Sequence, residues 1–188
     1  MEIYQEIREY VAFNLQESKD KELILTYMQL FNNLLTRENQ VVHFTSSAFI
    51  VNQTGTKTLF IYHKLYDTWS WTGGHVDGET DFLAVAQREA REETGLEILK
   101  PLSNRIASLD ILPVFGHLKH GQWIPSHLHL SVAYLFEGDD RAELVINEQE
   151  TKGVKWLKFS EIDTMSQEPG LISIYQKLIT KMLKLKDN

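Results

Sequence analysis

Apolar positions in the first part of the chain recur at helical spacing. One series runs from Ile3 to Leu15 and a second runs from Leu23 to Leu35. The polar run "ESKD" between them contains cap and turn residues. This pattern predicts two helices and a helical extension over residues 1–40. The extension carries no chemical signature, so we interpret it as a lid or a packing element.

From Val41 onward the pattern becomes typical of strands. The runs "VVHFTSSAFIV" and "KTLFIYHKL" are rich in β-branched and aromatic residues, and "NQTGT" between them predicts a hairpin loop. "RIASLDILPVF", "HLHLSVAYLFE" and "GVKWLKF" are further predicted strands. Ser160 is expected to cap a following helix, and "LISIYQKLITKMLKLK" has the apolar stripe of a helix. Strands flanked by a few helices predict a layered α/β or α+β domain over residues 41–188.

Composition narrows the class of protein. The chain has 188 residues, of which 43% are hydrophobic and 24% charged, as in a folded domain. It has no cysteine, which excludes disulfides and thiolate metal sites. No apolar run approaches the roughly 20 residues of a membrane span, and the acidic N-terminus is unlike a secretory signal. A cytoplasmic protein without a membrane partner is expected. The net charge of −7 argues against a nucleic-acid polymer as partner.

The stretch "GGHVDGETDFLAVAQREAREETGL" concentrates candidate chemistry at residues 73–96. Its helix is predicted to start near Thr80, as N-cap, and to end at Gly95. Glu89, Glu92 and Glu93 are related as i, i+3 and i+4, so their carboxylates share one helix face and repel one another. A positive group is therefore expected beside them.

Two groups could supply that charge. Arg88 and Arg91 could do so through ion pairs within the helix, which would make this an ordinary solvated face. A hard divalent cation bound with a phosphate is the other candidate, because carboxylate oxygens are its preferred protein ligands. Three glycines upstream, Gly73, Gly74 and Gly78, let a backbone approach a ligand closely. They favour the metal–phosphate interpretation.

At this point the stretch resembles the Nudix box, G-x5-E-x7-R-E-U-x-E-E-x-G-U, where U is aliphatic. The matching positions are Gly74, Arg88, Glu89, Ala90, Glu92, Glu93, Gly95 and Leu96. Thr80 stands where the box has its first glutamate, and Glu79 lies one residue earlier. We predict that Thr80 caps the helix, and that Glu79 turns toward Arg88 or a metal-bound water to supply the missing charge.

The resemblance implies a Nudix-like α/β/α sandwich around a mixed sheet. It implies hydrolysis of a diphosphate linkage in a small nucleoside diphosphate derivative, with Mg²⁺ or Mn²⁺ as cofactor. Glu89, Glu92, Glu93 and the Gly74 carbonyl would hold the metal, Arg88 would orient the glutamates, and Glu89 is the favoured general base. A carboxylate outside the box often contributes in this family. Glu148 and Glu150 are the local candidates, and a solvated acidic loop is the alternative.

Two further pairs of residues are candidates for ligand binding. His127 and His129, two apart in a predicted strand, share a face and could bind a metal or a phosphate; partly exposed polar positions are the alternative. No third ligand stands at a telling spacing, so no zinc site is predicted. Trp69 and Trp71 could stack on a flat substrate group, although core packing is expected for at least one of them.

The rival hypothesis for function is a binding module that senses a nucleotide or a sugar nucleotide on the same fold without hydrolysing it. A sensor would be expected to have lost glutamates from "REAREE", and this chain keeps all three. The enzyme hypothesis is therefore preferred. A homodimer is left open.

Overall fold

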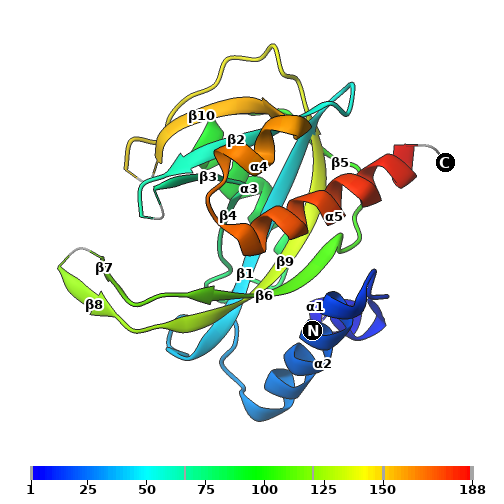
Figure 1. Ribbon diagram of the computed structural model, residues 1–188. Helices are drawn as coiled ribbons and strands as arrows, with labels where there is room; N and C mark the ends of the chain where they lie inside the picture. The colour runs from blue at the N-terminus through cyan, green and yellow to red at the C-terminus, as the bar shows by residue number, and fades with distance from the viewer. Residues whose placement is uncertain (1, 66, 120, 150, 187–188) are drawn as a thin grey trace.

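The computed structural model describes residues 2–65, 67–119, 121–149 and 151–186 (Figure 1). The helices are α1 (Glu2–Glu9), α2 (Leu15–Leu30), α3 (Phe82–Thr94), α4 (Ile162–Met165) and α5 (Pro169–Lys186), with a 3₁₀ turn η1 at Phe159–Glu161. The strands are β1 (Val42–Asn52), β2 (Lys57–His63), β3 (Thr68–Ser70), β4 (Thr72–His75), β5 (Leu99–Pro101), β6 (Ser108–Val114), β7 (His117–Lys119), β8 (Gln122–Ile124), β9 (His127–Gly138) and β10 (Thr151–Lys158).

Strand β1 is the centre of a mixed sheet. It pairs in parallel with β9 along its whole length, from Val42 opposite Leu128 to Asn52 opposite Gly138. On its other edge it pairs antiparallel with β4 and then with β2. The order β10-β2-β1-β9-β5 is completed by β3 on β2 and β6 on β9, while β7 and β8 form a separate hairpin. The predicted hairpin at "NQTGT" is confirmed, because β1 and β2 flank it.

Helices cover both faces of this sheet (Figure 1). On one face, Phe44 packs with Phe82 of α3 (ring centroids 5.4 Å apart), and apolar residues of α1 and α2 join the same core. On the other face, Phe49 packs on Tyr175 of α5 (5.9 Å). Alternate β1 residues point to opposite faces, so the strand supplies both cores. The predicted α/β/α sandwich and two-helix extension are confirmed.

Two predicted helix boundaries are wrong. "ESKD" lies inside α2, and the break between the two helices comes earlier, where the Asn14 side chain caps α2 by accepting a hydrogen bond from the Glu17 amide (2.9 Å). Val11 is 86% exposed, so the first apolar series does not continue through it. Ser160 lies within η1 and is no cap, because the main chain leaves β10 at Lys158 directly into that turn.

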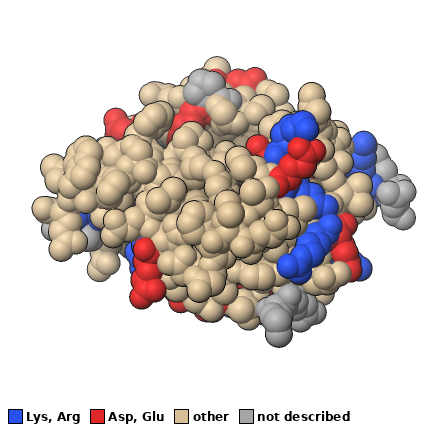
Figure 2. Space-filling model, turned by 90° about the horizontal axis from the view of Figure 1, so that it is seen from below, with Lys and Arg blue, Asp and Glu red and all other residues tan. Residues whose placement is uncertain are grey.

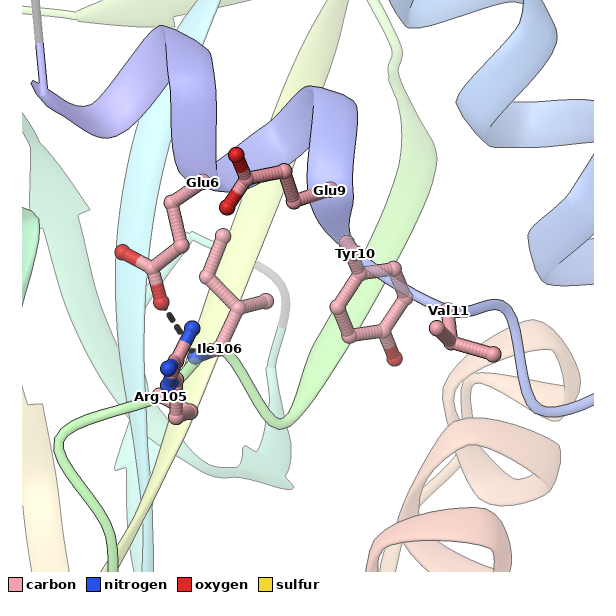
Figure 3. Close-up of a pocket in the computed structure, with 6 residues that line it drawn as sticks. All are labelled: Glu6, Glu9, Tyr10, Val11, Arg105 and Ile106. Atoms are coloured by element: carbon pink, nitrogen blue, oxygen red, sulfur yellow. Dashed lines mark hydrogen bonds between the residues drawn. The ribbon is translucent and has the colours of Figure 1, made fainter.

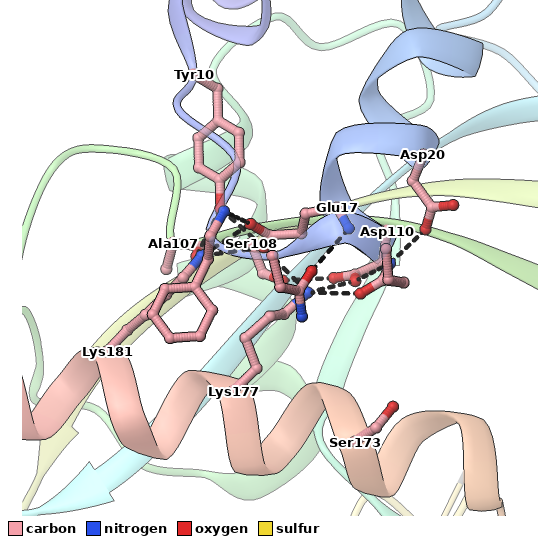
Figure 4. A network of polar contacts seen from close by, with 12 residues as sticks. Tyr10, Glu17, Asp20, Ala107, Ser108, Asp110, Ser173, Lys177 and Lys181 are labelled. Carbon is pink, nitrogen blue, oxygen red and sulfur yellow. Dashed lines mark hydrogen bonds and ion pairs between the residues drawn. The ribbon is translucent and has the colours of Figure 1, made fainter.

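A buried polar network connects α2 to α5 across strand β6 (Figure 4). Glu17 is fully buried, and its Oε1 lies 3.0 Å from Nζ of both Lys177 and Lys181. Lys177 Nζ also lies 2.6 Å from Oδ1 of Asp110 on β6. A buried carboxylate is tolerated only when charges and donors surround it, as they do here. The network ties the N-terminal helices to the C-terminal one.

Helix α1 is anchored by a second contact. Glu6 accepts a hydrogen bond from the backbone amide of Ile106 (2.8 Å) at a surface pocket that Tyr10, Val11 and Arg105 also line (Figure 3). Together with the burial of Ile3 and Ile7 in the sheet core, this contact makes the extension a packing element of the fold.

The face of the molecule seen from below has no large area of only positive or only negative side chains (Figure 2). On that face, Lys and Arg lie next to Asp and Glu at one side, and a broad area carries neither (Figure 2). Across the described part of the chain, no helix combines the length and hydropathy that a membrane span requires.

Replacing Glu17 with Gln is expected to lower the free energy of unfolding by about 3 to 5 kcal/mol at neutral pH, because it removes the ion-pair partner of Lys181 and leaves the buried Lys177 with Asp110 alone. Chemical denaturation measures the change. Glu22→Gln is the control, since Glu22 pairs with Lys19 on the surface and both side chains are more than half exposed. Its effect should be small. An equal loss in both variants would contradict a special role for the network.

The same difference should depend on pH. Burial alone would raise the pKa of Glu17, but the hydrogen bond from the Phe13 amide and the charges of Lys177 and Lys181 lower it from 4.5 to about 2. The stabilisation is complete above pH 4.5, where the unfolded carboxyl is ionised, and is lost as the pH falls through about 2. The gap between wild type and Glu17→Gln should therefore shrink over that range. A gap independent of pH would show that Glu17 is not ionised in the fold.

Candidate active site on the box helix

The glycine loop (residues 73–81) leaves strand β4 beside the central strand. Gly73 and Gly74 pair with Ser47 and Ser46 of β1. A Cβ at Gly73 would lie 2.7 Å from the carbonyl oxygen of Ser46, so no larger residue fits that pairing. Gly73 therefore lets β4 approach β1 closely, while the approach of these glycines to a ligand stays a prediction.

The loop then turns and is fastened to the N-terminal segment. Asp77 and Gly78 both have left-handed backbone angles, with φ of 45° and 93°. The Gly78 amide donates to the Leu35 carbonyl (2.8 Å), and Arg37 donates two hydrogen bonds to the Asp77 carboxylate (2.9 and 2.8 Å). The extension thus helps to hold the loop in place.

Helix α3 begins one residue later than predicted. Asp81 is its N-cap, and Asp81 Oδ1 accepts a hydrogen bond from the Ala84 amide (3.0 Å). The prediction that Thr80 caps the helix is wrong, because the carboxylate of Asp81 takes that role three residues before Ala84. The predicted end is confirmed: Gly95 has φ 69°, and its amide donates to the Arg91 carbonyl (2.8 Å).

Arg88 gathers three carboxylates. Its guanidinium lies 2.6 Å from Glu89, 3.0 Å from Glu79 and 3.5 Å from Glu92. The pKa of Arg88 is raised because these three charges more than offset its desolvation. The prediction that Glu79 turns toward Arg88 is confirmed. A residue one position before the expected glutamate thus contributes a carboxylate to the same cluster.

Glu93 and Glu89 join helix α3 to the glycine loop. Glu93 is only 3% exposed, and its Oε2 accepts a hydrogen bond from the Gly73 amide (3.0 Å). A Cβ at Gly74 would lie 2.5 Å from Cδ of Glu89, so the Glu89 carboxyl occupies the space that this glycine leaves open. The structure therefore brings Gly74, Glu89 and Glu93 together from both ends of the motif.

These residues fit a hard divalent cation. The donors gathered here are carboxylate oxygens beside main-chain groups of the glycine loop, and this is the donor set that Mg²⁺ and Mn²⁺ prefer. The absence of a side chain at Gly74 lets the Glu89 carboxyl lie directly against the main chain there. The arrangement also suits a phosphate, whose negative charge a cation would balance.

A comparison with models of protein families shows to which family this chain is related. The model of the NUDIX domain matches residues 42–178. This chain belongs to the Nudix family. The match covers the sheet, the box helix and most of α5, and it begins where the helical extension ends.

Solved structures share this Nudix fold at low sequence identity. An Ap4A hydrolase of C. elegans in a binary complex is 15% identical, with 75% of this chain and 98% of that one covered and a TM-score of 0.54. A NUDIX-family hydrolase from Clostridium perfringens is 23% identical (74% and 97% covered, TM-score 0.52). The E. coli dihydroneopterin triphosphate pyrophosphohydrolase is 15% identical (73% and 94% covered, TM-score 0.54). The search of curated protein sequences returned no match.

The remaining predicted residues of this Nudix domain lie outside the box. Glu148 is exposed in the loop between β9 and β10, and its backbone carbonyl accepts a hydrogen bond from Lys64. Glu150 lies outside the described residues. Trp71 is 7% exposed and packs edge-on against Tyr175, so the core packing expected for at least one of the two tryptophans is confirmed for Trp71. Trp69 is half-buried between Tyr62 and Lys155.

The two predicted histidines do share a face. His127 Nε2 lies 3.1 Å from His129 Nε2. No third ligand stood at a telling spacing in the sequence, but in the structure His43 and His75 join the pair, and the ring nitrogens of His43, His75 and His129 lie within 4.8 Å of one another. The sequence carried no spacing signal for this group, because it depends on the register of β1 with β9 and β4.

Burial makes these rings poor bases. Desolvation, together with the neighbouring His43, lowers the pKa of His75 to about 3. Desolvation and the histidines around it lower the pKa of His129 to about 2. The pKa of His43 is lowered as well, again chiefly by burial. All three imidazoles are therefore neutral at physiological pH.

The capping contact gives a direct prediction. Asp81→Ala should cost about 1 kcal/mol of stability, the usual loss when a carboxylate cap is removed, whereas Thr80→Ala should cost little, because Thr80 is exposed and does not cap the helix. Thermal or chemical denaturation of the two variants measures both values. A larger loss for Thr80→Ala would restore Thr80 as the cap.

Proposed function

We propose that the chain is a metal-dependent hydrolase that cleaves a diphosphate linkage in a nucleoside diphosphate derivative or a related small compound. The observation that carries this proposal is the gathering of Glu79, Glu89 and Glu92 around Arg88 beside the glycine loop. Membership of the Nudix family supports a pyrophosphatase-type reaction. The proposed setting is the cytoplasm, without nucleic-acid polymer or membrane as partner, and a homodimer stays an alternative.

The proposed roles follow from position. Glu89, Glu92 and Glu93, with the Gly74 carbonyl, would hold Mg²⁺ or Mn²⁺. Such an ion supplies charge neutralisation of the diphosphate and lowers the pKa of bound water. Arg88 keeps the carboxylates together in spite of their repulsion. Glu89 is the proposed general base, because its carboxyl lies against Gly74, where the helix meets the loop.

Other side chains could position the rest of the substrate. Trp69 keeps part of its indole exposed and stays a candidate for stacking on a flat group. Glu148 and Glu150 stay candidates for an accessory carboxylate. The similar structures are named for hydrolysis of Ap4A and of dihydroneopterin triphosphate. Those names support the reaction class here and leave the substrate to be found.

A screen of nucleoside triphosphates, dinucleoside polyphosphates, nucleotide sugars and NAD-like compounds with Mg²⁺ or Mn²⁺ tests the proposal by phosphate or monophosphate release. Glu92→Gln should fold normally, because Glu92 is 54% exposed and its ion pair with Arg88 is long. Its turnover should nevertheless fall by orders of magnitude, as expected for loss of a metal ligand.

Glu97→Gln is the matched control, since Glu97 is exposed just beyond the helix and outside the box glutamates. It should keep full activity. Near-full activity of Glu92→Gln would remove Glu92 from the site. Tight binding of one of these compounds by the wild type without any turnover would favour the sensor hypothesis.

Glu79→Gln tests the departure from the box. Glu79 is half-exposed and contacts Arg88, so the substitution should leave stability nearly unchanged. If Glu79 supplies the charge that Thr80 lacks, metal affinity or kcat should fall at least several-fold. Isothermal titration with Mn²⁺ and initial rates measure the two effects. A variant that is silent in both would show that the three helix glutamates act alone.

A further inference from the structure

The histidine cluster (His43, His75, His127 and His129) is built from three strands that are distant in sequence. β1 lies between the other two: His43 pairs directly with His129 of β9, and Thr45 pairs with His75 of β4. The ring centroid of His43 lies 5.0 Å from that of His75, 4.9 Å from that of His127 and 5.1 Å from that of His129. The four rings therefore converge on one point of the sheet.

Backbone carbonyls fix the tautomer of two of these rings. His43 Nδ1 lies 2.9 Å from the Asn39 carbonyl oxygen, and His127 Nδ1 lies 2.9 Å from that of Pro125. A carbonyl only accepts, so each Nδ1 carries a proton, and in the neutral form of each ring Nε2 presents a lone pair. This is the outer contact that orients metal-binding histidines in proteins.

One of those lone pairs has no donor. His43 is 4% exposed, and within the described part of the chain no group hydrogen bonds to its Nε2. Leaving a buried acceptor unsatisfied is costly. A cation bound by the ring nitrogens would satisfy His43 Nε2 and would replace the contact between His127 Nε2 and His129 Nε2.

The spacing also suits such an ion. The nitrogens of His43, His75 and His129 lie within 4.8 Å of one another, and His127 Nε2 is 3.1 Å from His129 Nε2. Two nitrogens on a tetrahedral Zn²⁺ are about 3.3 Å apart, given Zn–N distances of about 2.0 to 2.1 Å. Small side-chain rotations would close the set.

The cluster lies on the opposite face of the sheet from the box carboxylates. Phe44 packs with Phe82 of α3, so His43, its neighbour in the strand, points away from that helix. Likewise Gly74 faces Glu89, and His75 follows it on the other face. The two donor sets are therefore separate, one of oxygens and one of imidazole nitrogens.

We propose that the histidine cluster is a second metal site, which binds a transition metal ion of the Zn²⁺ class and fastens the start of β1 and β9 to the end of β4. Imidazole ligands select Zn²⁺, Co²⁺, Ni²⁺ or Cu²⁺ over Mg²⁺. Bound there, the ion stabilises the strand that carries Gly73 and Gly74, independently of the ion at the carboxylates.

Isothermal titration of the full-length, metal-stripped chain with Zn²⁺ tests the proposal, in excess Mg²⁺ and without a polyhistidine tag. We expect one ion bound per chain. His75→Ala and His129→Ala should each weaken binding by about 100-fold or more, since even an outer contact of a metal ligand is worth about 10- to 100-fold. His63→Ala, a histidine on β2, is the matched control and should bind as the wild type does.

Co²⁺ gives a second readout that does not use activity. The wild type should show the intense visible bands of four-coordinate Co²⁺, and the cluster variants should lose them. Glu92→Gln should keep both the bands and the Zn²⁺ affinity. If Glu92→Gln no longer binds Zn²⁺, or if excess Mg²⁺ displaces Zn²⁺ from the wild type, the Zn²⁺ ion binds at the carboxylates and the proposal is wrong.

A further variant separates loss of metal binding from loss of folding. His127 is half-exposed, so His127→Ala should fold, as circular dichroism can verify, and should bind Zn²⁺ at least several-fold more weakly with an altered Co²⁺ spectrum. Wild-type affinity and spectrum in His127→Ala and His75→Ala would overturn the proposal, as would absence of Zn²⁺ binding to the wild type. Inactivity toward every diphosphate compound, with Zn²⁺ binding intact, would contradict only the proposed function.

Discussion

The pairing of β1 with β9 in parallel and with β4 antiparallel is the constraint on which both candidate sites depend. It places the glycine loop at the edge of β1 and sets the entry of the chain into α3. It also decides which side chains of three strands become neighbours. A shift by one residue would turn His43 toward α3 and Phe44 away from it, which would lose both the apolar core and the cluster. The register is therefore held by the burial of Phe44 on one face and Phe49 on the other.

In two groups of like charges in this fold, an opposite charge lies between the carboxylates. Arg88 lies among Glu79, Glu89 and Glu92, and Lys177 lies between Glu17 and Asp110. The two groups differ in solvent access. The Arg88 group is partly exposed, and the proposed cation and substrate would share its carboxylates. The Glu17 group is buried from solvent, and its ion pairs hold α2 against α5.

The alternation of side chains along a strand separates two kinds of chemistry within a few residues. Gly74 leaves room for the Glu89 carboxyl on one face, and His75 joins the imidazoles on the other. Oxygen donors favour hard cations, and neutral imidazoles favour borderline ones. The proposed diphosphate-binding loop and the proposed second metal site would thus share one short strand without competing for the same ion.

The sequence by itself determined the features that depend on local spacing. The i, i+3, i+4 pattern put Glu89, Glu92 and Glu93 on one face, Gly95 ended the helix, and the β-rich runs became β1, β2 and β9. The sequence did not determine which of two adjacent residues caps helix α3. Asp81 is the N-cap instead of Thr80, because both side chains offer a hydrogen-bond acceptor and they are one residue apart. Only the tertiary structure decided that His43, His75, His127 and His129 meet, and that Glu17 pairs with Lys177. Those contacts join residues tens of positions apart, and strand register and helix docking, which no local pattern encodes, set the distances between them.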